Sequence, residues 1–98
     1  MERINLIGRD GETLTKMAFI YTVALKIEKG IDEEGIPTEI EDEVNRVADM
    51  LLAFKVDNYP DEEIDSNGIS KFMTELLFNR FSQEIIQETF ELMIPYQN

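Results

Sequence analysis

Apolar residues recur at intervals of three and four along most of the chain, which predicts amphipathic α-helices. The first helix is predicted over residues 12–29, with Gly30 as the residue that ends it. A second apolar face suggests that this helix is central or has a partner on its far side. Its β-branched and aromatic residues leave a strand as the less favoured interpretation. The stripe and the second face comprise Leu14, Met17, Ala18, Tyr21, Ala24 and Leu25, and Phe19, Ile20, Val23 and Ile27.

The second helix is predicted over residues 38–55, after a loop that contains Gly35 and Pro37. Thr38 and Glu41 have the spacing of a capping box, in which their side chains accept hydrogen bonds from first-turn amides. Met50 and Leu52 lie off the stripe that this helix is expected to bury. The stripe consists of Ile40, Val44, Val47, Ala48, Leu51 and Phe54.

A connector over residues 57–67, containing Pro60, leads to a third helix predicted over residues 69–81. Ser82 is a favourable N-cap for a fourth helix, which Pro95 ends. A single kinked helix is the alternative for this part of the chain. The apolar positions are Phe72, Met73, Leu76, Leu77 and Phe81 in the third helix and Ile85, Ile86, Phe90 and Met93 in the fourth.

Short connections between amphipathic helices favour an antiparallel arrangement. We therefore expect an all-α fold, a small antiparallel bundle of about four helices, in one domain over residues 1–98. Residues 1–11 are ambiguous, because a turn signal at residues 8–11 fits either a short strand with a hairpin or an arm. The core is predicted to include Leu14, Met17, Tyr21, Leu25, Val44, Val47, Leu51, Phe72, Leu76 and Phe90.

Several apolar residues fall off the best stripe of their helices. If they form a contiguous exposed patch, they mark an interface, and the chain is a homodimer or an assembly subunit. The alternative is that central helices bury two faces, which is favoured for Phe19 and Ile20. The residues concerned are Phe19, Ile20, Met50, Leu52, Phe78, Ile86 and Ile94.

Charge is distributed unevenly along the chain, which has 21 acids, nine bases and a formal net charge of −12. Two segments without a base hold twelve acids, and the remainder of the chain carries nine acids and nine bases. Glu84 and Glu88 belong to this balanced remainder, and we expect them to lie outside any partner-binding surface. The twelve are Asp32, Glu33, Glu34, Glu39, Glu41, Asp42 and Glu43 in the first segment and Asp57, Asp61, Glu62, Glu63 and Asp65 in the second.

The two acidic segments lie at opposite ends of the second helix, about 27 Å apart at 1.5 Å per residue. Acids at a helix N-terminus are favoured by its dipole, and acidic loops aid solubility, so a solvated face is one interpretation. The other interpretation is a partner-binding surface. Clustered carboxylates repel one another, and a protein that needed them only for solubility could relieve this repulsion with interspersed bases. Direct binding to nucleic acid or an anionic membrane is disfavoured, since both need positive charge.

The leading hypothesis is therefore an acidic inhibitor or adaptor that docks on a basic surface of a nucleic-acid-handling protein, as a nucleic-acid mimic. Small inhibitors of this kind are typical of phages and mobile elements, which is an analogy of class. The chain contains no His and no Cys and no Gly-rich phosphate loop, so we expect neither an enzyme nor a bound metal or cofactor. Its longest apolar stretch, residues 17–25, is far short of a bilayer span, and without a signal peptide we expect a cytoplasmic protein.

Two motifs come near to known sites. Residues 63–68 are similar to the opening of an EF-hand loop, but Ser70 and Thr74 stand where an apolar residue and a bidentate carboxylate belong, so we expect no calcium site.

Residues 46–52 resemble the Glu-x-x-Asp motif and apolar run of the all-helical MazG-type pyrophosphohydrolases, which hydrolyse nucleotides with magnesium. Arg46 replaces the first metal-binding acid, and the preceding helix lacks the family's Glu-x-x-Glu pair. A helix with Asp49 on its buried side, paired to a base, explains the pattern equally well.

Overall fold

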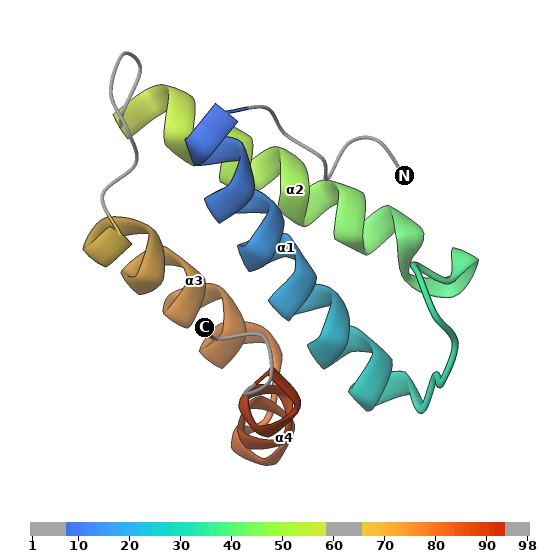
Figure 1. Cartoon of the computed structure of the whole chain (residues 1–98). Helices are drawn as coiled ribbons and strands as arrows, with labels where there is room; N and C mark the ends of the chain where they lie inside the picture. The colour runs from blue at the N-terminus through green and yellow to red at the C-terminus, as the bar shows by residue number, and fades with distance from the viewer. Residues whose placement is uncertain (1–7, 59–65, 94–98) are drawn as a thin grey trace.

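The computed structural model describes residues 8–58 and 66–93 of the chain. These residues form four α-helices and no strand, which confirms the predicted all-α fold (Figure 1). The helices are α1 (Gly8–Lys29), α2 (Thr38–Asn58), α3 (Ser66–Arg80) and α4 (Gln83–Met93). Residues 1–7, which hold most of the predicted strand or arm, lie outside the described part of the chain.

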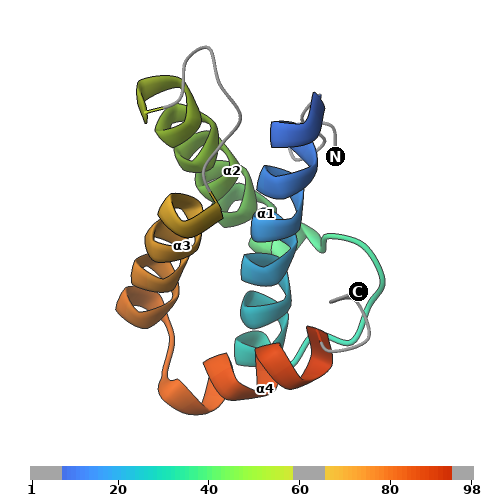
Figure 2. The same ribbon diagram turned by 60° about the vertical axis from the view of Figure 1, so that its left-hand side comes forward.

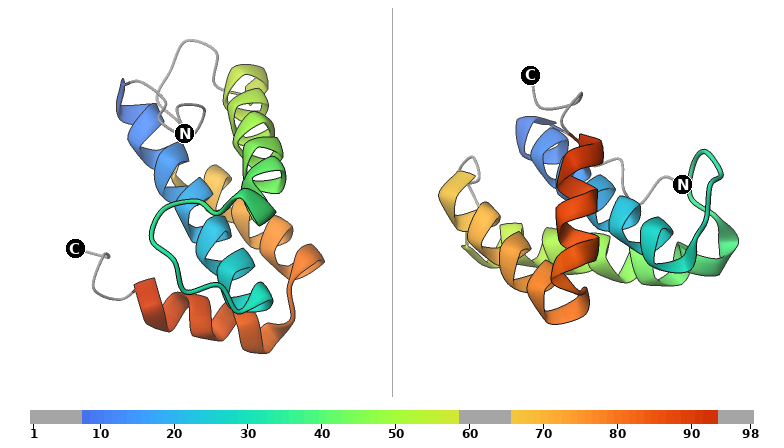
Figure 3. Two further views of the ribbon diagram at one scale, coloured as in Figure 1. Left: turned by 90° about the vertical axis from the view of Figure 1, so that its right-hand side faces the viewer. Right: turned by 90° about the horizontal axis from the view of Figure 1, so that it is seen from below.

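The first three helices alternate in direction, and the fourth lies across them. Helices α1 and α2 run side by side in opposite directions, joined by the loop 30–37 (Figure 1). Helix α3 then runs in the opposite direction to α2. Helix α4 turns away from α3 and crosses the C-terminal half of α1, as Figures 2 and 3 show. This crossing places α4 opposite the loop 30–37, on the far side of α1 from α2.

Helix α1 begins earlier than predicted, because residues 8–11 belong to it and do not form a turn. A glycine in a helix interior costs only about 1 kcal/mol relative to alanine, and extending an existing helix adds a hydrogen bond per residue. The predicted end is confirmed. Gly30 has φ 67°, and the N–H groups of Gly30 and Ile31 donate to the carbonyls of Ile27 (3.2 Å) and Lys26 (2.9 Å), a Schellman motif.

The other helix ends also follow local signals. Helix α2 begins at Thr38 as predicted, although its terminus is closed by the Ile40 N–H donating to the Pro37 carbonyl (3.1 Å), not through the Thr38 side chain. Helices α3 and α4 are separate, not one kinked helix. Ser82 caps α4 as predicted, its Oγ accepting from the Ile85 N–H at 3.3 Å.

The core forms where α1 packs against α2 and α4. Of the ten residues predicted there, six are buried, namely Leu14, Tyr21, Leu25, Val44, Val47 and Leu51. Met17, Phe72 and Leu76 are partly buried and pack against this core. The aromatic ring of Phe72 stacks on Phe54 of α2 with centroids 4.4 Å apart, which joins α3 to α2.

The prediction for Phe90 was wrong, because its side chain is 42% exposed. Helix α4 instead buries Ile86, Thr89 and Met93. Thr89 can be buried because its hydroxyl donates to the Ile85 carbonyl at 2.8 Å, which satisfies the polar group locally.

The residues predicted to lie off the stripes divide between core and surface. Ile20 and Ile86 are buried, Met50 is half-buried, and Ile94 lies outside the described residues. Phe19, Leu52 and Phe78 are exposed. Burial of a second face of the first helix is thus confirmed for Ile20 and was wrong for Phe19. In the portion that the structure describes, no helix combines the length and the apolar character needed to cross a membrane.

Candidate functional site

Most of the predicted partner-binding acids of the first segment lie together on the loop 30–37 and the first turns of α2. Five of them are exposed, and no ion pair to any of the five is found among the described residues. We call these five the acidic loop surface: Asp32, Glu33, Glu34, Glu39 and Asp42. Glu41 is half-buried beside them. The surface is therefore made of carboxylates that face solvent without a base to neutralise them.

The second acidic segment is described only at Asp57, which is exposed near the C-terminal end of α2. Its other members, Asp61, Glu62, Glu63 and Asp65, lie outside the described residues. Asp57 lies 15 residues beyond Asp42, the acid of the acidic loop surface farthest along α2, which is about 22 Å along the helix at 1.5 Å per residue. At 1.5 Å per residue this helix is about 31 Å long, slightly more than the sequence predicted.

Glu43 differs from its neighbours because it is paired within the molecule. Its Oε2 accepts hydrogen bonds from the Tyr21 hydroxyl at 2.8 Å and from Nε of Arg80 at 2.9 Å. The same guanidinium binds Glu28 through two parallel bonds of 2.7 Å, and it lies over the Phe81 ring at 4.8 Å. Arg80 of α3 thus ties α1 to α2, which the sequence did not predict.

The pKa values of this cluster reflect its charge pairing. The bidentate hydrogen bond from Arg80 lowers the pKa of Glu28. Burial opposes ionisation of Glu43, but the hydrogen bonds from Arg80 and Tyr21 outweigh it and hold the pKa of Glu43 below its ordinary value. Burial and the hydrogen bond to Glu43 raise the pKa of Tyr21, so its hydroxyl keeps its proton as a donor. Glu43 is therefore engaged within the molecule, unlike the five acids of the acidic loop surface, and its role in partner binding stays a prediction.

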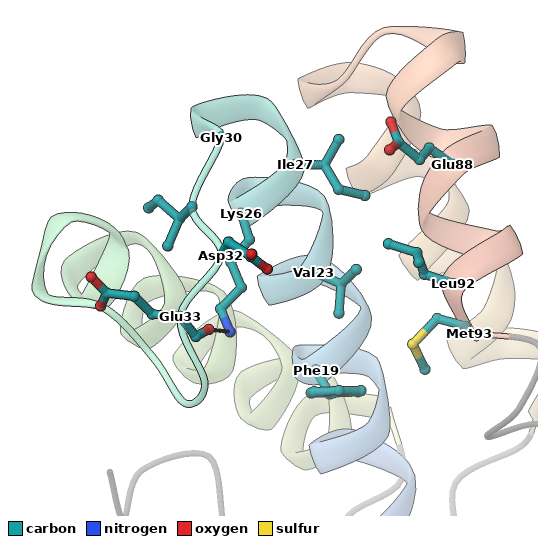
Figure 4. A pocket seen from close by; sticks show the side chains of 11 residues that line it. Phe19, Val23, Lys26, Ile27, Gly30, Asp32, Glu33, Glu88, Leu92 and Met93 are labelled. Atoms are coloured by element: carbon teal, nitrogen blue, oxygen red, sulfur yellow. Dashed lines mark hydrogen bonds between the residues drawn. The ribbon is translucent and has the colours of Figure 1, made fainter.

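A groove of about 660 Å³ lies between α1, the loop 30–37 and the C-terminal half of α4 (Figure 4). Phe19, Val23 and Ile27 of α1 form its floor, and Leu92 and Met93 of α4 form one wall. Phe19 is 43% exposed and Leu92 is 52% exposed, so large apolar surfaces face solvent here. Individual polar and apolar residues were visible in the sequence, but the crossing of α4 over α1 that creates the groove was not.

Acids line both sides of this groove. Asp32 and Glu33 come from the loop, and Glu88 comes from α4, although we expected Glu88 to lie outside the working surface (Figure 4). The one base among the lining residues, Lys26, donates from Nζ to the Glu33 backbone carbonyl at 2.7 Å, which directs its ammonium to the loop. Helix α4 itself contains three acids and no Lys or Arg. The acidic loop surface therefore continues into a groove with apolar walls.

Neither the calcium-binding-like segment nor the segment that resembles the MazG motif shows the geometry of a metal site in the described residues. Within residues 8–58 and 66–93, no group of three or more carboxylates is placed to hold a metal ion. Asp49 is exposed, so its predicted place on the buried side of its helix was wrong. Arg46 is also exposed, and its guanidinium donates to Sδ of Met50 at 3.3 Å. Much of the EF-hand-like segment falls outside the described residues, and the absence of a calcium site stays a prediction.

The chain matches no protein-family model, no curated protein sequence and no solved structure. The resemblance to MazG-type enzymes thus has no family match behind it.

Proposed function

We propose that this protein is a non-enzymatic interaction module that binds a basic surface on another protein through its acidic loop surface. The observation that carries the proposal is the contrast between Glu43 and its neighbours. Glu43 is neutralised inside the molecule by Arg80, whereas the five acids of the acidic loop surface are exposed without an ion pair in the described structure. Concentrated negative charge of this kind favours a positively charged partner.

The partner that fits best is a nucleic-acid-handling protein, which the module inhibits or recruits as an adaptor. Such proteins carry basic patches that bind phosphates. Carboxylates placed on that patch occupy the positions of phosphates and exclude the nucleic acid. Electrostatic attraction of this type increases the association rate and makes it sensitive to salt.

Affinity capture from a lysate of the host organism, at low and at high salt, tests this proposal. The working variant is Glu39→Lys/Asp42→Lys, which reverses two exposed acids of the acidic loop surface. Glu43 is left intact because its loss would break the pairing with Arg80. The matched control, Glu75→Lys/Glu84→Lys, makes the same charge change at exposed positions on α3 and α4.

We expect a basic protein to be retained at low salt by the wild type and the control, and lost with the working variant. Both variants should fold, since surface substitutions usually change stability by less than about 0.5 kcal/mol. Retention of the same partner by the working variant at physiological salt would show that these acids serve only solvation. Once a partner has been captured, a competition assay with the purified partner tests whether this protein and nucleic acid exclude each other from it.

A homodimer or assembly subunit is the second candidate, and one observation favours it. Leu52 and Val56 lie one turn apart on α2 and are 41% and 54% exposed, which forms a short apolar strip. This candidate predicts a melting temperature that rises with protein concentration. It also predicts that Leu52→Gln, and not reversal of the acids, weakens self-association.

A further inference from the structure

The floor of the groove has the spacing of a helix-binding strip. Phe19, Val23 and Ile27 follow one another at intervals of four residues on α1, so they lie along one side of that helix. Eight residues of helix rise about 12 Å, which is two turns. A second helix lying along this strip would meet it with residues at intervals of three and four.

The walls of the groove are apolar near the floor and acidic at the top. Ile31 of the loop and Leu92 of α4 extend the apolar surface on the two sides. Asp32 stands on the loop side and Glu88 on the α4 side, so a carboxylate flanks the apolar strip from each direction, whereas the Glu33 side chain points away from the strip (Figure 4). Lys26 keeps its positive charge in its hydrogen bond to the Glu33 carbonyl, and the lining residues still carry a formal net charge of −2, from three acids and one base.

We propose that this groove accepts the apolar face of a basic amphipathic helix from the partner protein. The inference rests on the proposed function and adds where and how the partner is held. The bound helix places apolar residues at i, i+3 or i+4, and i+7 against Phe19, Val23 and Leu92. Its Lys and Arg residues, on both flanks of that face, meet Asp32 on one side and Glu88 on the other.

Charge complementarity selects this occupant over others of similar shape. A second copy of this chain, with net charge −12, would bring acids against acids at both walls. An uncharged apolar helix would fill the floor but leave the acids facing it without a partner. A basic amphipathic helix satisfies the floor and both walls together.

Two synthetic peptides of roughly 18 residues, long enough for five helical turns, test the inference. One carries Leu at i, i+4, i+7 and i+11 with Lys and Arg on the flanks. The other has the same composition but permuted Leu positions, so that no helical face is apolar. Affinity is measured by fluorescence anisotropy, and binding is located by amide chemical shifts on the ¹⁵N-labelled protein.

We expect the patterned peptide to bind at least about tenfold more tightly than the permuted one, and to shift the amides of Val23, Ile27 and Leu92. Equal affinities, or shifts confined to residues 32–42, would overturn the inference, because charge alone would then account for binding. Absence of binding by both peptides would overturn it as well.

Substitutions in the groove give an independent readout. Leu92→Gln removes an exposed apolar wall and should weaken the patterned peptide about tenfold, a change of about 1.4 kcal/mol. Glu88→Gln should mainly slow association and reduce its salt dependence. Phe78→Gln is the matched control, since Phe78 is 57% exposed on α3 and does not line the groove, and it should leave affinity unchanged. Equal affinities for wild type and Leu92→Gln would refute the groove.

The failure of this inference can be told from failure of the proposed function. If Glu39→Lys/Asp42→Lys loses the captured partner and Leu92→Gln retains it, the acidic loop surface functions without the groove. If Leu92→Gln loses the partner and the acid reversal retains it, the acidic loop surface is not the working surface. Melting temperatures of all variants, compared with the wild type, separate these outcomes from loss of folding.

Discussion

Replacing Arg80 with Met tests how far one side chain holds the helices together. Arg80 connects α3 to Glu28 of α1 and Glu43 of α2, while its stem and guanidinium cover the Phe81 ring. Met retains most of the apolar stem and removes the charge. Without the guanidinium, Glu28 and Glu43 face each other as uncompensated carboxylates.

The expected loss follows from the three contacts and their exposure. The Glu28 pair is about one-third exposed, so solvent screening limits it to about 0.5–1 kcal/mol. The hydrogen bond to the more buried Glu43 contributes about 1 kcal/mol, and the contact with Phe81 adds about 0.5–1 kcal/mol. We therefore expect Arg80→Met to lower the free energy of unfolding by about 2–3 kcal/mol. For a domain of this size that lowers Tm by roughly 8–24 °C.

Urea unfolding followed by circular dichroism measures this loss, with Arg46→Met as the matched control. Arg46 is exposed on α2, its hydrogen bond goes to a methionine sulfur, and it affects Glu43 through its charge without a hydrogen bond, so its loss should stay below about 0.5 kcal/mol. A double-mutant cycle with Glu43→Gln should show a coupling of about 1 kcal/mol. Equal stability of the Arg80 and Arg46 variants, or zero coupling, would show that the cluster is fully solvated and does not hold the fold.

Three further outcomes follow from the core, a helix end and the charge cluster. Leu51→Ala should lower the unfolding free energy by about 2–5 kcal/mol, because Leu51 is 0% exposed, and a loss below about 0.5 kcal/mol in urea unfolding would contradict its burial. Gly30→Ala should cost about 1 kcal/mol in the same assay, because φ is +67° and no atom would clash with the added Cβ; a gain in stability would contradict the left-handed helix end. The lowered pKa values of Glu28 and Glu43 predict that the stability difference between wild type and Arg80→Met is constant above about pH 5 and declines as pH falls below about 4.3. A difference that stays the same as pH falls well below the ordinary glutamate pKa would contradict that pairing.

Local signals in the sequence were sufficient for the helices and most of their ends. Gly30 and Ser82 were identified from their residue types alone, because a left-handed C-terminal glycine and an N-capping serine act on backbone groups within a few residues. Five of the six residues in the predicted stripe of α2 are buried and Phe54 is partly buried, because apolar residues at intervals of three and four share one face of a helix. The acids of the acidic loop surface were likewise recognised from their clustering.

The sequence was less informative about which face of a helix is buried where the helix has apolar residues on several sides. In α4 the sequence favoured Phe90 for the core, but the structure buries Thr89 in its place. Periodicity states which residues share a face, and it does not state which face meets α1. That choice depends on close packing between two crossing helices, and Thr89 can face α1 because the Ile85 carbonyl satisfies its hydroxyl.

The sequence by itself thus determined four helices, the stops between them and a concentration of negative charge, because each depends on neighbours within about one or two helical turns. Only the tertiary structure decided that Arg80 neutralises Glu43, which lies 37 residues away in the chain. It also decided that Glu88 joins Asp32 at one groove. Both arrangements are set by how α3 and α4 pack on α1 and α2, and packing geometry between helices depends on all of their side chains together.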